Sequence, residues 1–333
     1  MSGAFTPPEK ERGAALLTVL LLVTITGALA AAAFDKLLLS QRLAANFAGL
    51  EQARNFSTGI ESLALLTIDD MTARSRQLTT LAGNWNGATR QIPLPGGIGT
   101  GAVTIRDGGN CFNLNSVVQG GNGAPTAARP LGMAQFAGLM GAIGIPSSQA
   151  QSSAAAAADW ADNDTTPVSG GAEDADYLRR ARPHRTANAP FAEASELRAV
   201  AGMTPELYAR LRPWLCALPT TDLSPINVNT LSLEQAPLLA MLAPEQLGVE
   251  RARRVLSTRP PNGWRTPMDF WRIEAMSELD LASEAQMQVQ LRTQWFALEI
   301  ATTVAGSEVI ETALVDARNQ PSRVAIRRWG ADE

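Results

Sequence analysis

Acidic side chains are concentrated in one short stretch, WADNDTTPVSGGAEDADY, which runs from Trp160 to Tyr177. Its carboxylates are Asp162, Asp164, Glu173, Asp174 and Asp176, with two glycines between the second and the third. Carboxylates crowded on one loop repel one another unless they spread apart or bind a cation. Calcium takes about six to eight oxygen ligands from flexible loops, so the stretch predicts a calcium site, although its spacing is not that of an EF-hand. Two other interpretations stay open: a solvated acidic turn, and a catalytic carboxylate pair that lacks an evident nucleophile or cleft.

Other residues that carry chemistry are few. His184 is the only histidine, which excludes His-rich zinc sites and any Ser–His pair that is not built on it. The net charge is −4 and there is no basic stripe, which argues against a partner with a phosphate backbone. The two cysteines, Cys111 and Cys216, are expected to pair in a disulfide if the chain is exported; the alternative is two buried free thiols.

The acidic stretch and the cysteines follow an apolar N-terminal segment. Ala14–Phe34 is uncharged from end to end, and about 20 apolar helical residues cross a bilayer. Three interpretations compete: a cleaved secretory signal with its site near Ala28-Leu29-Ala30, a plain signal anchor, and a pilin-like N-terminus that is cut between Gly13 and Ala14. The apolar spacing continues past Lys36 as an amphipathic pattern, so one helix is predicted from Ala14 to about Arg76, which favours the third interpretation.

The rest of the chain alternates between strand-like and helix-like patterns. Residues 77–101 read as loop with at most one short strand near Arg90–Leu94, and Ala102–Arg106 with Cys111–Leu114 reads as a hairpin. The predicted helices are Leu131–Ile143, Ser147–Trp160, Ala194–Val200, Pro205–Leu215, Leu231–Met241, Pro244–Ser257, Pro267–Ile273 and Ser277–Thr293. The last three strands are Trp295–Val304, Val309–Asp316 and Arg323–Trp329. Strands on both sides of the helices most simply share one sheet.

A second motif begins at Asn227-Val228-Asn229-Thr230 and continues into two apolar helices. It resembles helix-hairpin-helix or SAM-like modules, and Phe191–Leu218 looks like a degenerate copy. Such modules often bind DNA through hairpin amides. Here the hairpin is Ala243-Pro244-Glu245-Gln246, which lacks paired glycines and carries an acid where a phosphate would lie. We therefore expect two packing modules and no nucleic-acid partner.

Taken together, these features resemble the K-type minor pseudopilins of the type II secretion system. The carriers of the resemblance are the leader ending in Gly13, Thr18 where most pseudopilins have Glu as fifth residue of the mature chain, the stretch GGNCFNLNSV, and the W-x-D-x-D…G-A-E-D pattern. The resemblance implies an α+β pilin-like fold, with the long helix packed on an antiparallel sheet and a large all-α insertion. It also implies one or two structural calcium ions, for which Asp162, Asp164, Glu173 and Asp174 match the motif and Asp176 is a further candidate.

The resemblance implies a structural function rather than an enzyme. A K-type pseudopilin sits at the tip of the pseudopilus with the I- and J-type pseudopilins, starts its assembly and supports secretion across the outer membrane. Its further partners are other pseudopilins, secreted substrates and the prepilin peptidase, which leaves Ala14 first and methylated. It spans the inner membrane once, with its bulk in the periplasm. The alternative is a membrane-anchored periplasmic enzyme or ligand-binding protein.

The predicted division of the chain follows from these patterns. It comprises a leader over 1–13, a transmembrane helix over 14–34, a pilin-like helix and first strands over 35–115, a helical insertion with the first SAM-like module over 116–220, the second SAM-like module over 221–292, and C-terminal strands of the sheet over 293–333.

Overall fold

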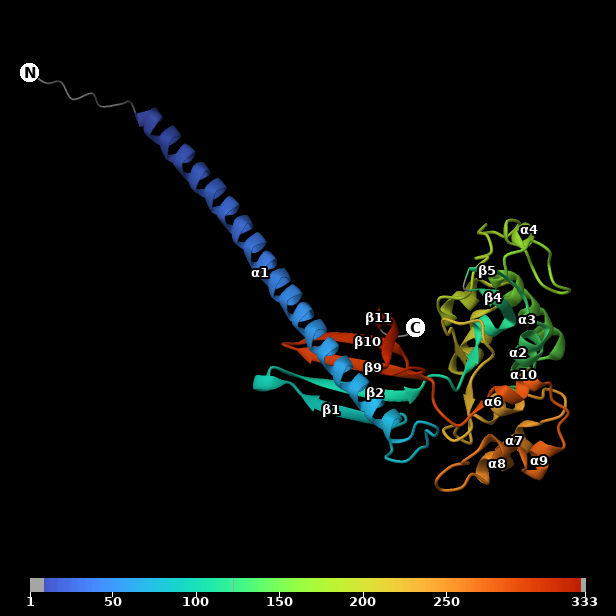
Figure 1. Ribbon diagram of the computed structural model, residues 1–333. Helices are drawn as coiled ribbons and strands as arrows, with labels where there is room; N and C mark the ends of the chain where they lie inside the picture. Colours follow the sequence, from blue (N-terminus) through green and yellow to red (C-terminus); the bar gives the residue numbers. More distant parts are fainter. Residues whose placement is uncertain (1–8, 122, 331–333) are drawn as a thin grey trace, which may run out of the picture.

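A long helix, a twisted sheet and a block of short helices make up the protein (Figure 1). The computed structural model describes residues 9–121 and 123–330. Residues 1–8 of the predicted leader therefore lie outside the described residues. In Figure 1 the helix projects from one face of the sheet, and the helical block lies beside the sheet.

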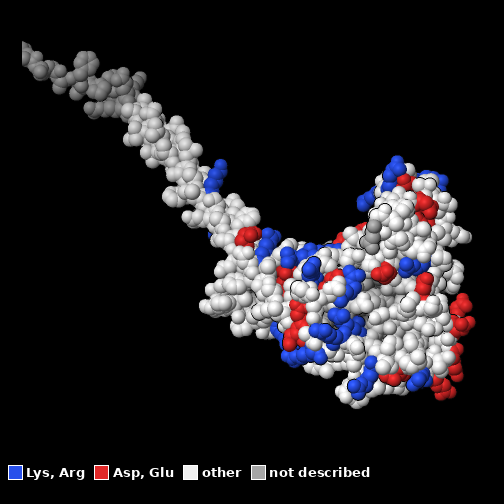
Figure 2. Space-filling model, viewed as in Figure 1, with Lys and Arg blue, Asp and Glu red and all other residues white. Residues whose placement is uncertain are grey.

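Helix α1 (Glu9–Arg74) confirms the prediction of one continuous N-terminal helix. At 1.5 Å per residue it is about 100 Å long. Every residue from Gly13 to Ala48 is exposed, and the first part of this stretch appears without charge in Figure 2. By length and composition alone, this helix is able to cross a membrane. Exposed apolar side chains over so many turns require a cover that the described chain does not supply.

The sheet combines strands from both ends of the chain, as expected. Its order is β1-β2-β9-β10-β11, and all neighbours are antiparallel. The strands are β1 (Thr89–Pro93), β2 (Gly99–Asp107), β9 (Trp295–Val304), β10 (Ser307–Asp316) and β11 (Arg323–Trp329), with a short 3-10 turn η1 (Pro95–Gly97) between the first two. Because β2 pairs directly with β9, everything between them in sequence leaves the sheet and returns to it.

The C-terminal half of α1 packs on one face of this sheet. Ala53, Ile60, Ala64 and Ile68 are buried there at steps of seven, four and four residues, which is one face of a helix. The approach is close at Gly101 of β2, where a Cβ would lie 2.2 Å from Cδ1 of Ile60. Leu63, which follows the same apolar spacing, is 54% exposed and does not belong to this buried face.

The predicted hairpin between Ala102–Arg106 and Cys111–Leu114 is wrong. β2 pairs instead with β1 and β9, and the second piece becomes β3 (Phe112–Asn113), which pairs in parallel with β6 (Leu215–Cys216). The cause is Asp107, whose carboxylate accepts hydrogen bonds from the Gly109 N–H at 3.0 Å and from two distant threonines. These bonds turn the chain out of the sheet and into the helical block.

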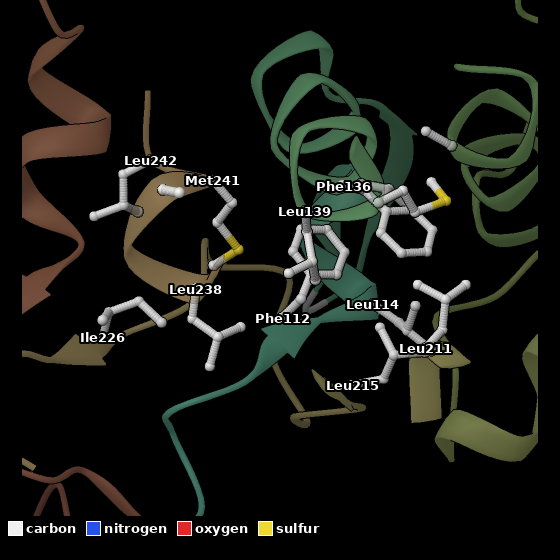
Figure 3. Packing of buried hydrophobic residues seen from close by; sticks show 14 of the residues in the cluster. Phe112, Leu114, Phe136, Leu139, Leu211, Leu215, Ile226, Leu238, Met241 and Leu242 are labelled. Carbon is white, nitrogen blue, oxygen red and sulfur yellow. The ribbon is translucent and has the colours of Figure 1, made fainter. Parts of the chain in front are cut away.

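The helical block has its own core, centred on Phe112, Phe136 and Leu139 (Figure 3). The two phenyl rings stack with centroids 4.7 Å apart. Its helices are η2 (Leu114–Val117), α2 (Pro130–Ala142), α3 (Ser147–Ala161), α4 (Asp174–Tyr177), η3 (Ala194–Ala199), α5 (Pro205–Leu211), η4 (Arg212–Trp214), α6 (Ala236–Ala240), α7 (Val249–Ser257), α8 (Pro267–Trp271), α9 (Glu274–Ser277) and α10 (Ser283–Met287). Its other strands are β4 (Val118–Gly121), β5 (Ala124–Ala128), β7 (Ile226–Asn227) and β8 (Val289–Gln290).

The later helices are shorter than their patterns predict. The expected helix over Ser277–Thr293 is wrong: α9 ends at Ser277, α10 occupies only part of the range, and β8 follows. Strand pairing overrides the local pattern here, because the Ile226 and Val228 N–H groups donate to the Gln288 and Gln290 carbonyls. Likewise α6 and α7 cover only parts of Leu231–Met241 and Pro244–Ser257.

The stretch GGNCFNLNSV joins the parts of the block. A disulfide links Cys111 to Cys216, with their Cα atoms 5.8 Å apart. The Asn113 side chain donates to the carbonyls of Thr220 and Asp222 at 2.9 and 3.0 Å. Because Asn113 is fully buried, these bonds fix the chain that enters the block against the chain that follows β6.

Candidate metal centre

The end of α3 positions the first acids of the stretch. The alanine run of this helix is buried against α2 and η2, and the helix ends where the Asp162 N–H donates to the Ala158 carbonyl at 2.9 Å. Asp159 lies three residues before Asp162, and residues at this spacing share a helix face. Both are buried, at 0% and 1% exposure.

The loop after α3 is held by its own polar side chains. Asn163 Oδ1 accepts from the backbone N–H and the hydroxyl of Thr126 in β5, at 2.6 and 2.7 Å, and its Nδ2 donates to the Asn188 carbonyl at 2.8 Å. Asp164 Oδ1 accepts from the Thr166 N–H at 2.7 Å, which is a local Asx turn. The Asp164 carboxylate is thereby held at the start of the loop, and its residue is exposed.

Gly171 lets the loop return across Asp159. The Val168 N–H donates to Asp159 Oδ1 at 2.9 Å, and the Gly171 N–H donates to the Val168 carbonyl at 2.7 Å. A Cβ on Gly171 would lie 1.9 Å from Asp159 Oδ2. Only glycine fits this contact, which explains one of the two glycines inside the acidic stretch.

The structure brings Asp162, Asp164 and Glu173 together. One ligand oxygen from each lies within 4.8 Å of the others. Glu173 immediately precedes α4, and it is 5% exposed. The group therefore joins the end of α3, the loop and the start of α4, and two of its three members are shielded from water.

The buried oxygens of this group have few partners among the described residues. Both carboxylate oxygens of Glu173, Oδ1 of Asp162 and Oδ2 of Asp159 are buried without a hydrogen bond. Burial, followed by the charges of Asp164, Asp159 and Glu173, raises the pKa of Asp162 to about 7. Burial also raises the pKa of Asp159 to about 6, and it raises that of Glu173 as well. Buried carboxylates without a partner destabilise the folded state. The arrangement therefore favours the binding of a cation that compensates their charge.

The donor set suits a calcium ion. All of the candidate ligand atoms are carboxylate oxygens, which hard cations prefer, and calcium binds them at about 2.3–2.6 Å. Oxygens on opposite sides of one such ion stand about 5 Å apart, and the separations within this group stay inside that span. Asp159, which the sequence pattern did not indicate, acts electrostatically on Asp162 and Glu173 and has a buried Oδ2 without a hydrogen bond.

Comparisons with known proteins bear on what this chain does. Two family models, both described as type II secretion system (T2SS) protein K, match residues 110–220 and 226–292. The type II secretion system protein K of Pectobacterium carotovorum is 32% identical over 326 residues, which is 97% of each chain. That of Klebsiella pneumoniae is 32% identical over 322 residues, again 97% of each chain. The chain belongs to the type II secretion system protein K family.

A solved structure agrees with this family membership. A chain from the crystal structure of the GspK-GspI-GspJ complex of enterotoxigenic Escherichia coli superposes with a TM-score of 0.72 at 31% identity. The match covers 85% of this chain and 97% of that chain. A protein K family member is a component of a secretion machine, which disfavours the alternative of an anchored enzyme or ligand-binding protein; absence of catalysis is still a prediction.

In this protein K family member, Asp174 and Asp176 do not join the acidic group, although the motif included them as candidate ligands. Asp174 accepts from the Thr186 N–H at 3.0 Å and pairs with Arg185 at 2.7 Å; the bonds from Thr186, followed by that from Arg185, lower its pKa. Asp176 pairs with Arg179 and accepts from the Glu173 N–H. Their carboxylates are already neutralised by arginine, so they serve to fold the loop.

The motif at Asn227 also has a structural role in this family member. Asn227 Nδ2 donates to the Thr79 carbonyl and to the Thr293 hydroxyl at 3.1 and 3.0 Å. Asn229 Nδ2 donates to the Trp264 carbonyl at 3.0 Å. Both asparagines are buried, so the amide of Asn227 joins the helical block to the segment between α1 and β1, and that of Asn229 joins two parts of the block. The SAM-like character of the two modules and the absence of a nucleic-acid partner stay predictions.

Proposed function

We propose that this chain is the K-type minor pseudopilin of a type II secretion system, and that it assembles with I- and J-type pseudopilins at the pseudopilus tip. The observation that carries the proposal is its likeness over 97% of its length to protein K relatives. The superposable chain comes from a complex that contains GspK, GspI and GspJ. In this position the chain starts pseudopilus assembly and supports protein secretion across the outer membrane.

The arrangement of the molecule supports a place at a filament end. The helical block adds a second body beside the sheet (Figure 1), which we expect at the end of a filament of packed helices rather than along its length. The block has a separate buried core, so it keeps its shape without further partners. A subunit of this form fits as a cap, above which no further subunit is added.

The N-terminal helix is the proposed anchor. The prepilin peptidase cuts after Gly13, Ala14 becomes the methylated N-terminus, and the apolar half of α1 spans the inner membrane once with the bulk of the chain in the periplasm. The exposure of every residue from Gly13 to Ala48 supports this reading. Thr18 donates to the Ala15 carbonyl at 2.8 Å, so its hydroxyl is satisfied within its own helix. A tip subunit needs no carboxylate to pair with the amine of a subunit above it.

Calcium is the proposed structural cofactor, as one ion or two. Asp162, Asp164 and Glu173 would be the ligands of an ion. Asp159 would either be a further ligand or be the neighbour of one. The support is the set of buried, unpartnered oxygens described above. The ion would supply the positive charge that these carboxylates lack and would fasten α3 to α4. Its role is structural, because the ion would join two parts of one loop.

Complementation tests the proposal. In the bacterium that carries this chain, deletion of its gene should abolish secretion of type II substrates, and the full chain supplied in trans should restore it. The tagged full-length protein, extracted from membranes in mild detergent, should carry the cognate I- and J-type pseudopilins with it. A matched control is the chain with Gly13→Val, which should remain unprocessed and fail in both assays. Normal secretion in the deletion strain, or a purified chain without either pseudopilin, would contradict the proposal.

A further inference from the structure

The contact between α1 and the sheet contains two buried carboxylates and one arginine. Glu61 projects from α1 and is 3% exposed, and Glu311 projects from β10 and is 0% exposed. Arg327 comes from the edge strand β11, and its side chain is 39% exposed. The three residues therefore connect the long helix to two neighbouring strands, next to the apolar core between α1 and the sheet.

Of the two carboxylates, Glu61 accepts the hydrogen bonds of the arginine side chain. Arg327 donates from Nε to Glu61 Oε2 at 2.8 Å and from Nη2 to Glu61 Oε1 at 2.6 Å, which is the strong bidentate arrangement. Glu311 Oε1 lies 3.3 Å from Arg327 Nε without a hydrogen bond of its own from that nitrogen. The other oxygen of Glu311 accepts from the Ser57 hydroxyl at 2.5 Å. One cation thus faces two carboxylates.

The surroundings of the second carboxylate favour its protonated form. Burial raises the pKa of Glu311, and a hydrogen bond to Glu61 raises it further, while the Ser57 bond and the Arg327 charge act in the opposite direction. In its protonated form Glu311 donates to Glu61, and the three side chains are neutral as a group. With that proton removed, two buried anions share one cation and repel each other.

Neighbouring groups give no other compensation at this point. The positions that pair with Glu311 are Ile300 of β9 and Trp329 of β11, neither of which titrates. On α1 the next basic residue is Arg54, whose guanidinium lies 5.7 Å from the centre of the Trp329 ring. Glu299 of β9 is exposed and pairs with Arg106 of β2. In the sheet register it does not lie opposite Glu311, so it does not take part in this contact.

We propose that Glu61, Glu311 and Arg327 form a proton-operated lock, in which one proton held between the two carboxylates keeps α1 closed against β10 and β11. Loss of the proton loosens the contact at Glu61 while the rest of the molecule stays folded. The pH of the compartment would then control how firmly the proposed membrane helix is held against the periplasmic part of the chain. It uses only contacts within this chain, so it holds whether or not the proposed tip assembly does.

The sign of the effect follows from proton binding. The closed state binds the proton more tightly than the open state, since Glu311 returns to water when α1 lifts away. Stability of the contact is therefore complete below the ordinary glutamate range and is lost as the pH rises through the raised pKa of Glu311. A one-proton lock changes the opening equilibrium by at most about tenfold per pH unit.

Hydrogen exchange of the full-length protein in detergent micelles tests the lock. Exchange of α1 peptides around Ser57 and Glu61 is measured from pH 5 to pH 9, and each rate is divided by the rate of unprotected peptide at the same pH. Protection of these peptides should fall with rising pH. Protection at the far end of α1, where Asp69 accepts from the Ser322 N–H at 2.8 Å, should stay constant.

Variants distinguish the effect of the proton on Glu311 from the effect of side-chain packing. Glu311→Gln carries a permanent N–H donor toward Glu61, so its protection should be high and independent of pH. Glu299→Gln removes an exposed carboxylate from the same sheet and should keep the wild-type pH dependence. If Glu311→Gln does not fold, Glu61→Gln, which leaves one carboxylate for one arginine, should also remove the pH dependence. Protection of the wild type that is constant over this range, or a pH dependence that survives in both glutamine variants, would overturn the proposal.

Discussion

Removal of one carboxylate from the acidic group gives the sharpest prediction about the candidate metal centre. Glu173→Gln keeps the size of a side chain that is 5% exposed and whose two oxygens have no hydrogen-bond partner among the described residues. In the wild type, calcium at about 100 times its Kd should stabilise the folded state by about 2.7 kcal/mol. Each kcal/mol moves the Tm of a domain the size of the helical block by about 2–4 °C. Calcium should therefore raise the Tm of the wild type by about 5–11 °C.

The variant should respond in two opposite ways. In calcium it should lose most of the increase in Tm, since a neutral amide is a weaker ligand than a carboxylate. In chelator it should melt no lower than the wild type, because it lacks one of the buried anions that repel Asp159 and Asp162. Magnesium should substitute poorly for calcium in the wild type, since it demands a tighter octahedral geometry.

The assay is a thermal scan of the full-length protein in micelles, followed by the tryptophan signal. Asp176→Asn is the matched control: it lies in α4, pairs with Arg179 at the surface, a pair worth about 0–1 kcal/mol, and its amide oxygen is still able to accept from the Glu173 N–H. This control should keep the full calcium response. A wild-type Tm that is indifferent to calcium would refute the site, and an equal loss in Asp176→Asn would refute its assignment to Asp162, Asp164 and Glu173.

Three further predictions follow from single residues. Gly13→Val should leave the uncut precursor in the membrane fraction, because the leader peptidase requires a residue without a side chain before the cut; normal maturation by mass spectrometry would contradict the pilin-like N-terminus. Alkylation of the unfolded, unreduced protein should find no free thiol, in keeping with the Cys111–Cys216 bond, and two modified cysteines would contradict it. Gly171→Ala should abolish the calcium response and lower the Tm in calcium, because its Cβ would lie 1.9 Å from Asp159 Oδ2; an unchanged response would show that the loop does not cross Asp159 as described.

Local patterns predicted the elements that carry long, regular signals. The continuous helix α1, the alanine-rich α3 and the last three strands follow from periodicity alone, and so does the idea that distant strands share one sheet. The hairpin after β2 was not predictable in this way. The turn residues at Asp107 suit a hairpin, but that carboxylate accepts from Thr230 and Thr293, which are 123 and 186 residues away in sequence. No local pattern contains such contacts.

The sequence indicated the acidic stretch as a whole, but not which of its carboxylates lie close together; its role as a metal site stays a prediction. The pattern marked five carboxylates, and three of them meet. The other two could not be separated from these by sequence, since their partners, Arg185 and Arg179, belong to the same kind of charged loop. Asp159 was missed because it lies inside the predicted helix, although its position three residues before Asp162 is a signal that helical geometry supplies.

The pair Glu61–Glu311 and the group Asp162, Asp164 and Glu173 both bring carboxylates close together, and each requires a compensating positive charge. Beside the sheet, Arg327 supplies a charge and, in the proposed lock, Glu311 retains a proton, so the compensation is internal. In the helical block Arg179 and Arg185 are paired with Asp176 and Asp174, and the proposed calcium ion would compensate Asp162, Asp164 and Glu173. The calcium response should therefore be confined to the helical block. In hydrogen exchange, calcium should protect the α3–α4 loop and leave the peptides of β10 unchanged; protection of β10 by calcium would show that the two groups are coupled.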